Sequence, residues 1–427
     1  FTQEQSGALQ IDRLMLLERL IAQIEGRRED LAQAISREMG APITFSRVNQ
    51  IESAISHLQV ILDAARDSSN CVEIASGGHY IAYEPMGVAA LITPWNWPLN
   101  QTALKVGAAL VAGCTMVFKP SEIATPSALI FAQCMHDAGA PDGLFNLVLG
   151  DGSVGAALCE HPDINIISFT GSTDVGRQIA SKAGANLIPA VMELGGKSAN
   201  ILFADCDVDL AVKQGIAHCF RNCGQSCNAA SRMLVERSIY DHVLRVAAEE
   251  AQSYCFGLPQ EEGSHLGPLV SAVQFDKVQD HIQGALAQGA RLIAGGPGRA
   301  EGFDSGFFPR ATVFADVTPD MQIFQREVFG PVLTLTPFDT EQEAISLANA
   351  TDYGLAGYVQ TSTPERAARV SMQMAAGMVQ VNGRSRAAGA PFGGIKNSGF
   401  GREAGLWGIR TFQHMKSLSG LDTHPAP

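Results

Sequence analysis

The sequence predicts an α/β protein built on two doubly wound, mostly parallel sheets. One series of short apolar runs alternating with helical segments begins at Gly87, and a second begins near Asn200. Such alternation is typical of β-α-β units, in which each helix crosses back over the sheet. The chain has 427 residues, and at about 150 residues per domain this length allows two or three domains. We therefore expect two α/β domains and one smaller β element.

Helical periodicity comes first, over residues 11–66, where apolar residues recur on one face. These residues include Leu14, Leu17, Leu20, Ile21 and Ile24. Residues 70–86 are typical of a β-hairpin that turns at Gly77 and Gly78. The tail after Arg410 is strand-like again, in TFQHMKSL. Edge strands of this kind pair readily with another chain, so we expect a homodimer or a homotetramer.

The first alternating series opens with the strand GVAALIT and a helix that we expect to stop at Gly113. Thr125 at the cap and Pro126 in the first turn predict the start of another helix. The later runs of this series are LFNLVL, GSVGAALCEH, INIISFT and DVGRQIASKAG. The second series contains ILF, RMLVE, RLIAG, PVLTLTPF, AGYVQ and MVQVN. Because no long linker separates the two series, we expect a tight domain pair with a cleft between them.

Composition excludes several classes of protein. Hydrophobic residues make up 46% and charged residues 17%, ordinary values for a folded globular chain. The net charge of −13, without a block of Lys or Arg, argues against nucleic acid as a partner. The longest apolar tract, residues 106–118, is too short to span a membrane, and the first residues do not resemble a secretory signal. Nine scattered cysteines indicate reduced thiols, so we expect a cytoplasmic protein.

Two cysteines four residues apart, in RNCGQSCNAAS, raise three possibilities. A metal site with Cys219, Cys223 and Cys227 lacks a fourth ligand nearby, and we expect no metal. A disulfide is disfavoured by the reducing compartment. The third possibility is one reactive thiolate beside a bystander, because a partly ionised thiol attacks carbonyl groups readily.

A literal GxGxxG follows the strand LFNLVL and includes Gly150, Gly152 and Gly155. A dinucleotide site of that kind also needs an acidic residue at a strand end about 20 positions later, but Asp174 falls in another turn. The motif therefore adds support for a dinucleotide site but does not establish one.

Seven motifs together are more specific than any one of them. They are PWNWP at 94–98, KPSE at 119–122, FTGSTDVG at 169–176, MELGGK at 192–197, NCGQSC at 222–227, EVFGP at 327–331 and PFGGIKNSG at 391–399. In this order and at these separations they resemble the aldehyde dehydrogenase superfamily, in its NAD(P)-dependent, hydrolytic, non-acylating form. The resemblance covers essentially the whole chain. One departure is that family members usually carry a strand pair ahead of the first helix, whereas this sequence begins within that helix.

The resemblance implies a Rossmann-like cofactor domain, a catalytic domain and a β oligomerisation element. The implied boundaries are 1–69 and 87–194, with 400–410 returning, for the NAD-binding domain, 195–399 for the catalytic domain, and 70–86 with 411–427 for the oligomerisation element.

By the same resemblance Cys227 is the nucleophile, and Asn96 and the Cys227 backbone N–H form an oxyanion hole. Negative charge develops on the former carbonyl oxygen during attack, and one preorganised donor stabilises it by about 3 kcal/mol. Glu193 in MELGGK would activate the water that hydrolyses the thioester. A cap or a salt bridge with Lys197 is its structural alternative. Glu403 in GREAG is a second carboxylate, for a proton relay or for pairing with Arg402 or another base.

The implied cofactor is NAD, and NADP is possible. Lys119 and Glu122 would hold the adenosine ribose, and Glu122 disfavours a 2′-phosphate. The remaining residues expected to bind the cofactor are Trp95, Ser121, Gly152, Gly171, Ser172, Gly176, Glu327 and Phe329. Gly171, Ser172 and Gly176 open a helix whose N-terminus suits a pyrophosphate. Glu327 would hold the nicotinamide ribose, with Phe329 against the ring.

The partner implied by the resemblance is a small aldehyde. We expect its pocket to be lined by Trp97, Gln101, Leu104, Cys223, Ser226, Asn228, Arg384, Arg386 and Phe392. Arg384 and Arg386 could bind a distal carboxylate, or point to solvent, or pair with acidic residues. Two other functions remain alternatives: a cofactor-independent thiol hydrolase or acyltransferase, and an acylating semialdehyde dehydrogenase. The presence of Glu193 favours hydrolysis to the free acid.

Overall fold

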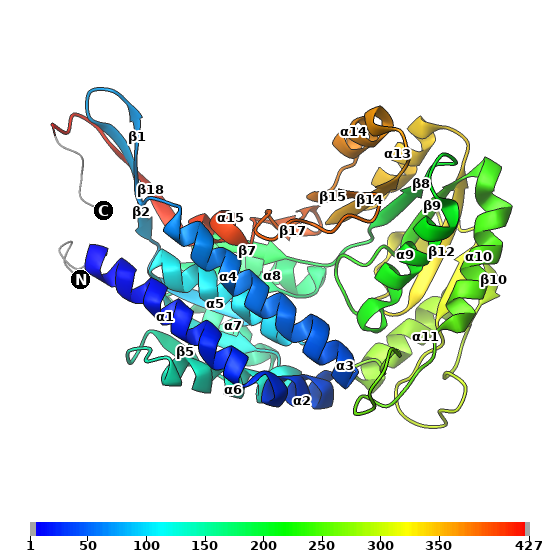
Figure 1. The fold of residues 1–427 in the computed structure, drawn as a ribbon, viewed down its shortest axis with the longest axis horizontal. Helices are drawn as coiled ribbons and strands as arrows, with labels where there is room; N and C mark the ends of the chain where they lie inside the picture. Colours follow the sequence, from blue (N-terminus) through cyan, green and yellow to red (C-terminus); the bar gives the residue numbers. More distant parts are fainter. Residues whose placement is uncertain (1–5, 423–427) are drawn as a thin grey trace.

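Two mostly parallel β-sheets with helices on both faces form most of the chain in a computed structural model that describes residues 6–422 (Figure 1). The α/β class and the pair of sheets predicted from the sequence are confirmed. No helix in the described part of the chain is long and apolar enough to cross a membrane.

The N-terminal helices pack on one another and on α5 (Pro98–Ala112) and α6 (Thr125–Asp137), two helices of the first sheet. They are α1 (Ser6–Gly26), α2 (Arg28–Met39), α3 (Ile43–Phe45) and α4 (Glu52–Arg66), with a π-helical turn, η2 (Ser46–Ile51), between the last two. One face of α1 buries Leu17, Leu20 and Ile24, as the periodicity predicted. These side chains join the largest apolar cluster, which also takes in α5 and α6. The early helices therefore belong to the first domain physically, although they precede its strands.

The first sheet has the order β17-β7-β6-β3-β4-β5. Its strands are β3 (Val88–Thr93), β4 (Thr115–Pro120), β5 (Phe145–Leu147), β6 (Ile166–Thr170), β7 (Ala190–Glu193) and β17 (Gly399–Phe400), and only β17 is antiparallel to its neighbour. Its helices are α5 (Pro98–Ala112), α6 (Thr125–Asp137), α7 (Gly152–Glu160) and α8 (Thr173–Ala185). Helices α5 and α6 cover one face and α7 and α8 cover the other. Gly113 caps α5 in the left-handed conformation, as expected.

One helix start differs slightly from the prediction. Thr125 is the first residue of α6, and Ala124 occupies the cap position without a side-chain hydrogen bond. A 3-10 turn, η3 (Glu122–Ala124), precedes the helix, and the Thr125 hydroxyl donates to the carbonyl oxygen of Glu122. The hydroxyl therefore closes this turn and does not cap the helix.

The second sheet has the order β10-β11-β12-β9-β8-β14-β15. Its strands are β8 (Ala199–Leu202), β9 (Arg232–Glu236), β10 (Arg291–Ala294), β11 (Thr312–Ala315), β12 (Val332–Phe338), β14 (Ala356–Gln360) and β15 (Met378–Val381). Helices α9 (Val208–Phe220) and α10 (Tyr240–Ser253) pack on one face. Helices α11 (Ala272–Ala287), α12 (Gln322–Gln325), α13 (Glu341–Asn349) and α14 (Pro364–Gln373) cover the other. Only β10 runs antiparallel.

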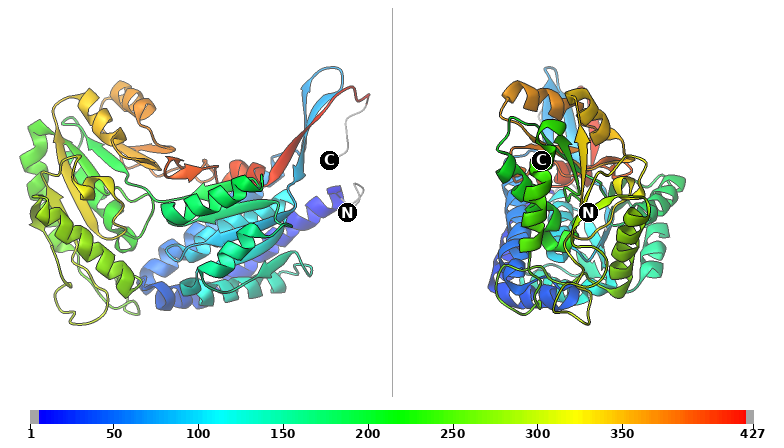
Figure 2. Two further views of the ribbon diagram at one scale, coloured as in Figure 1. Left: turned by 180° about the vertical axis from the view of Figure 1, so that it is seen from behind. Right: turned by 90° about the vertical axis from the view of Figure 1, so that its right-hand side faces the viewer.

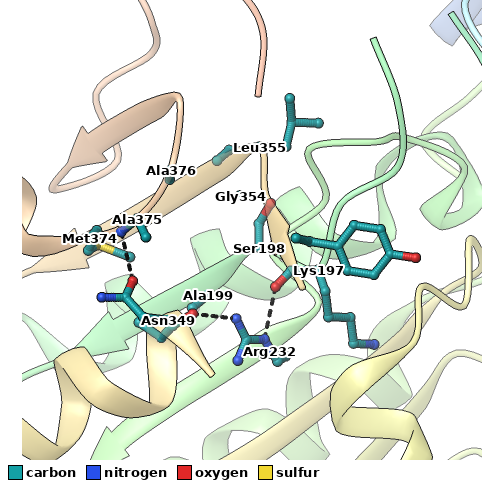
Figure 3. Close-up of a pocket in the computed structure, with 13 residues that line it drawn as sticks. Lys197, Ser198, Ala199, Arg232, Asn349, Gly354, Leu355, Met374, Ala375 and Ala376 are labelled. Atoms are coloured by element: carbon teal, nitrogen blue, oxygen red, sulfur yellow. Dashed lines mark hydrogen bonds between the residues drawn. The ribbon is translucent and has the colours of Figure 1, made fainter. Parts of the chain in front are cut away.

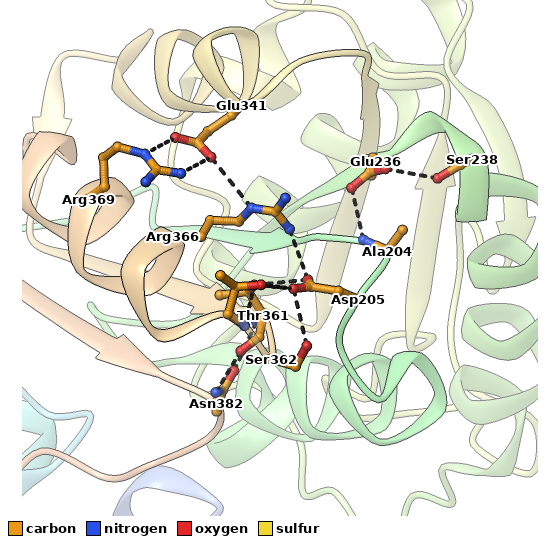
Figure 4. Close-up of polar contacts among 11 residues, drawn as sticks. Ala204, Asp205, Glu236, Ser238, Glu341, Thr361, Ser362, Arg366, Arg369 and Asn382 are labelled. Atoms are coloured by element: carbon orange, nitrogen blue, oxygen red, sulfur yellow. Dashed lines mark hydrogen bonds and ion pairs between the residues drawn. The ribbon is translucent and has the colours of Figure 1, made fainter.

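A polar network fastens α14 to the end of β8 (Figure 4). Asp205 accepts hydrogen bonds from the hydroxyls of Thr361 and Ser362 and pairs with Arg366 at 3.1 Å. Arg366 also lies 3.5 Å from Glu341 on α13. The network joins two helices and a strand end, and its role is structural.

A three-stranded antiparallel sheet projects from the body of the first domain (Figure 2). Strands β1 (Cys71–Ala75) and β2 (His79–Pro85) form the predicted hairpin, and β18 (Gln413–Leu418) pairs with β2. Val72, Ile74 and Met415 are exposed on it. The last residues of the expected oligomerisation element, 423–427, lie outside the described residues.

A short segment near the C-terminus connects the two sheets. Strand β16 (Ile395–Lys396) pairs with β13 (Tyr353–Gly354) beside the second sheet, and β17 immediately after it pairs with β7 of the first. Between them Ser398 is fully buried, and its hydroxyl donates to Gly195 O at 2.7 Å and accepts from Gly354 N at 3.0 Å. Helix α15 (Gly405–Thr411) follows and packs on α4 and α5.

Candidate active site

The loop that carries the two cysteines has an unusual backbone. After α9 the chain enters a 3-10 turn, η4 (Arg221–Gly224), in which Asn222 and Cys223 both have φ of 55°. Left-handed conformations are costly for residues other than glycine and need support from their surroundings. The Asn222 amide provides it, donating to Asn96 O at 2.9 Å and to Gln225 O at 3.2 Å. The loop is thus tied to the PWNWP segment of the first domain.

The two thiols of this loop lie in different environments. Cys223 is 3% exposed and packs in the apolar core of the second domain, where burial raises its pKa. Cys227 is half-buried and packs with Phe392 against a small cluster around Tyr358. Burial raises the pKa of Cys227 well above its usual range, and the charges of Glu193 and Glu327 add to the effect. These effects favour the thiol form of Cys227, and part of its side chain is exposed.

Asn96 follows strand β3 and lies against the cysteine loop. It is 4% exposed, and its Nδ2 donates to Gln225 O at 3.0 Å. An amide nitrogen carries two hydrogens, so one donor remains for a ligand. The neighbouring Trp97 donates from Nε1 to the Ser226 hydroxyl at 2.9 Å. The structure thus brings the predicted oxyanion residue to the loop of the predicted nucleophile.

Glu193 ends strand β7 and is 1% exposed. Neither of its carboxylate oxygens accepts a hydrogen bond at ordinary distance, although the Gly394 N–H lies near enough to favour the charged form slightly. Burial raises its pKa well above the usual range, and the charge of Glu403 adds to the shift. No ion pair joins it to Lys197, whose own pKa is lowered to about 7 by burial. A buried carboxyl group without a partner is costly in a purely structural role.

Glu403 pairs with a residue that the sequence reasoning missed. Its carboxylate bonds the ammonium group of Lys105, which is fully buried and also donates to the Ser168 hydroxyl at 2.9 Å. The alternative of a structural pairing is therefore what the structure shows, with Lys105 as the base in place of Arg402. A single lysine inside the apolar run of α5 was the signal that could have revealed this pair.

Two glycines of MELGGK allow the segments of Glu327 and Cys227 to approach the chain that follows strand β7. A Cβ on Gly195 would lie 2.3 Å from Glu327 Oε2, and one on Gly196 would lie 2.4 Å from Cys227 O. Real Cβ contacts are not that short, so a larger residue at position 195 would displace the Glu327 carboxylate, and one at position 196 would displace the Cys227 backbone. Glu327 in turn accepts the Gly196 N–H at 3.0 Å. Burial raises the pKa of Glu327 to about 7.

The residues expected to hold a dinucleotide gather at the carboxyl ends of the first sheet. Lys119 lies near the end of β4, and its Nζ donates to Pro120 O at 3.1 Å. Ser121 caps the turn that contains Glu122. Ser172 caps α8 and precedes Gly176, while Gly171 follows β6. In open parallel sheets ligands bind at this edge, and helix N-termini favour phosphate. The polar groups at this edge and the N-terminus of α8 therefore fit a dinucleotide in their chemistry, and a Cβ on Gly152, the first residue of α7, would meet open space.

Trp95 and Phe329 face each other from the two domains, with ring centroids 5.6 Å apart in an edge-on arrangement. Phe329 has a φ of 58°, a third left-handed residue at the domain junction. This contact lies between the segments of Asn96 and Glu327, where the predicted nicotinamide end of the cofactor would bind.

The residues of the predicted substrate pocket have varied surroundings. Gln101 and Leu104 are buried on α5, and the Tyr358 hydroxyl donates to Asn228 O at 2.8 Å. Arg221, which the sequence reasoning did not select, lies 5.3 Å above the Trp97 ring. Arg384 is exposed, whereas the Arg386 guanidinium lies 5.4 Å from the ring centre of Phe392. The two arginines thus differ in position.

A separate, narrow pocket that is partly open to solvent lies beside Lys197 and Ser198, at the end of MELGGK (Figure 3). Arg232 lines it and donates to the carbonyl oxygens of Lys197, Leu347 and Ala348, each at 2.8 Å. The lining includes none of Asn96, Glu193 and Cys227. The Arg232 guanidinium therefore fixes the backbone at the end of the MELGGK segment.

Comparison with known proteins places these motifs in a family. Residues 5–418 match the sequence profile described as "Aldehyde dehydrogenase family". A 3-succinoylsemialdehyde-pyridine dehydrogenase from Pseudomonas sp. is 45% identical over 96% of this chain and 86% of its own length. A crystal structure of an aldehyde dehydrogenase from Bartonella henselae is 47% identical, with a TM-score of 0.95 over 96% of this chain and 87% of that one.

A third similar protein was solved with ligands. It is aldehyde dehydrogenase C of Pseudomonas syringae, a cysteine-to-alanine mutant in complex with NAD+ and octanal. It is 45% identical, with a TM-score of 0.94 over 96% of this chain and 84% of that one. With a family match over nearly its full length and relatives of this identity, the chain belongs to the aldehyde dehydrogenase family.

Proposed function

We propose that this protein oxidises an aldehyde to a carboxylic acid with NAD+, through covalent intermediates on Cys227. The observation that carries the proposal is the convergence of Asn96, Glu193 and Cys227 from three separate segments. Asn96 bonds the cysteine loop directly, and Glu193 keeps both carboxylate oxygens without an ordinary hydrogen bond. The NAD+ complexes of Pseudomonas syringae and Bacillus cereus relatives support the choice of cofactor.

In the first half of the reaction the Cys227 thiol gives its proton to solvent water, and the thiolate attacks the aldehyde carbon to form a carbon–sulfur bond. The oxygen of the resulting thiohemiacetal becomes negatively charged. The free amide hydrogen of Asn96 and the Cys227 backbone N–H stabilise that charge. Because Asn96 is already fixed by its bond to Gln225 O, little reorganisation is needed when the charge develops.

NAD+, when bound, supplies the acceptor for the hydride that leaves the substrate carbon. Lys119 and Glu122 would hold the adenosine ribose, and the N-terminus of α8 the pyrophosphate. Glu327 would hold the nicotinamide ribose, and Trp95 and Phe329 would keep water from the reacting carbon. In this scheme residues 1–69 and 87–194 form the NAD-binding domain and residues 195–399 the catalytic domain.

In the second half the substrate is a thioester of Cys227, and Glu193 takes a proton from the water that attacks it. The tetrahedral intermediate collapses, the carbon–sulfur bond breaks, and the acid leaves. Glu193 does this only in its ionised form. Its raised pKa therefore makes it a stronger base once it is ionised, but less often ionised at neutral pH.

The test is to supply NAD+ and a simple aldehyde and to measure NADH and free acid together. We expect one acid for each NADH, without coenzyme A. Ester hydrolysis with no NADH would favour the thiol hydrolase, and a requirement for coenzyme A would favour the acylating enzyme. Either result would contradict the proposal.

A further inference from the structure

A cluster of three polar side chains lies close to the nucleophile without being part of the machinery above. His57 on α4 bonds from Nδ1 to Asn100 Oδ1 at 2.6 Å, and its Nε2 lies 3.2 Å from Arg386 Nη2. His57 and Arg386 are 329 positions apart in the chain. Only the packing of the C-terminal loop on α4 and α5 brings them together.

The hydrogen bonds of this cluster run from Arg386 through His57 to Asn100. Arg386 can only donate, so His57 Nε2 accepts and Nδ1 carries the proton that it donates to Asn100 Oδ1. Burial and the charge of Arg386 both lower the pKa of His57, in agreement with a neutral ring. The Asn100 Nδ2 group at one end, and further N–H groups of Arg386 at the other, then remain as donors. The cluster therefore offers donors to a ligand and no free acceptor.

Arg386 is held in place but keeps its charge uncompensated. Its Nη1 donates to Ala387 O and Ala390 O, and its guanidinium lies over Phe392. Among the described residues no carboxylate pairs with it at salt-bridge distance. Arg384, two positions earlier, is exposed. A fixed arginine loses little entropy when it binds a carboxylate, and such bonds are strong in a partly dry site.

Two contacts place the cluster near the reacting groups. Phe392, under the guanidinium, packs in the same apolar cluster as Cys227. Arg386 interacts electrostatically with Glu193. Asn100 stands one helical turn before Leu104 on α5, so it shares a helix face with a predicted wall of the pocket. A substrate that reaches from Cys227 past Phe392 would end at this cluster.

We propose that His57, Asn100 and Arg386 form a subsite for a carboxylate at the far end of the substrate, so that the preferred substrates are ω-oxo carboxylic acids. Arg386 and Asn100 bind the carboxylate, and His57 is a positioning residue that orients Arg386. The proposal rests on the dehydrogenase function above and narrows its substrate class.

The experiment compares ω-oxo acids of increasing length with neutral aldehydes of equal length, each with NAD+. We expect the best acid to exceed its neutral partner in kcat/KM by about 10- to 100-fold, the usual contribution of a hydrogen bond to a charged group. Arg386→Gln should remove this ratio by raising KM, whereas Arg384→Gln should keep it. Arg37→Gln, on an exposed helix face, is the charge-matched control for activity.

Conservative variants test the separate roles. Arg386→Lys keeps the charge and should retain part of the ratio. His57→Gln keeps an acceptor for Arg386 and should retain more of the ratio than His57→Ala. Calorimetric titration with a dicarboxylate, which cannot react, gives a readout independent of catalysis, and binding should be lost in Arg386→Gln.

Equal kcat/KM for acid and neutral aldehyde in the unmodified enzyme would overturn the subsite and leave the proposed function intact. The same holds if Arg384→Gln, and not Arg386→Gln, removes the ratio. Failure to oxidise any aldehyde would overturn both proposals together. If Arg386→Gln does not fold, the ratio in Arg386→Lys and in the His57 pair decides the question.

Discussion

The two large sheets contribute to the candidate site from opposite ends of their strands. In the first sheet Asn96 follows β3, Lys119 lies near the end of β4 and Glu193 ends β7, so this sheet presents its carboxyl ends. In the second sheet Cys227 precedes β9 and Glu327 precedes β12, so that sheet presents its amino ends. The candidate site thus joins the carboxyl edge of one parallel sheet to the amino edge of another.

This difference shows which part of the site follows from general rules. The carboxyl edge of a doubly wound sheet is the usual place for a dinucleotide, and short polar motifs after apolar strands point to it. No comparable rule covers an amino edge. The second sheet delivers Cys227 through a turn with two left-handed residues that is tied to the first domain by Asn222.

Removing the Cys227 thiol should have the largest effect, because it removes the nucleophile that the second sheet contributes. Cys227→Ala should lower dehydrogenase activity by about three orders of magnitude or more, because the covalent path is lost. Calorimetric titration should show unchanged NAD+ binding. Cys223→Ala is the matched control and should lose far less activity. Retained oxidation in Cys227→Ala would refute the assignment of the nucleophile.

Changing Glu193 removes the general base that the first sheet contributes, and it should affect a different step of the reaction. Glu193→Gln should lower the steady-state rate by about 100- to 10,000-fold, the usual range for general base catalysis. The first turnover should still produce NADH, because the hydride leaves before the thioester is hydrolysed. Rapid-mixing fluorescence would detect a burst of one NADH per site. A missing burst would mean that Glu193 acts earlier, for example on Cys227.

A methyl group added between the two sheet edges tests whether catalysis depends on the distance between them. Gly196→Ala places a Cβ 2.4 Å from the present position of Cys227 O, and should lower kcat/KM by up to about 100-fold, as a displacement of about 1 Å can do. Gly184→Ala on α8 has open space at its Cβ and serves as the control, with a melting temperature equal to or above that of the parent. Unchanged kinetics in Gly196→Ala would show that the edges need not touch.

The pH dependence of activity gives the smallest effect, and it reports on one ionisable group from each sheet. The pKa values of both Glu193 and Cys227 are raised, so each charged form becomes populated only as the pH rises. Activity should therefore increase from neutral to alkaline pH, since well below a pKa the ionised fraction grows about tenfold per pH unit. We would measure the steady-state rate of the parent and of Glu193→Gln as a function of pH. The part of the increase that comes from ionisation of Glu193 should be missing in Glu193→Gln. A flat profile would contradict the charge states described here.

Prediction from sequence succeeded where the signal is local. Alternating runs predicted both sheets, and glycine and proline signals predicted α5 and the β1–β2 hairpin. It did not find Lys105, whose bond to Glu403 joins positions 298 apart, or His57, whose partner lies on a distant loop. Such pairs depend on how α4, α5 and the C-terminal segment pack. A single sequence contains no pattern that reports that packing.

The buried Ser398 has a consequence for motion. The chain crosses between the domains at 194–198 and again at 395–399, and Ser398 ties the two crossings together through Leu194 N and Gly195 O. A hinge would have to bend two adjacent strands of chain at once and break these bonds. The two sheets should therefore keep a constant spacing through the catalytic cycle, and small-angle X-ray scattering should give the same radius of gyration with and without NAD+. Substrates would then exchange through fixed openings, so the rate of product release would depend on local loop movement.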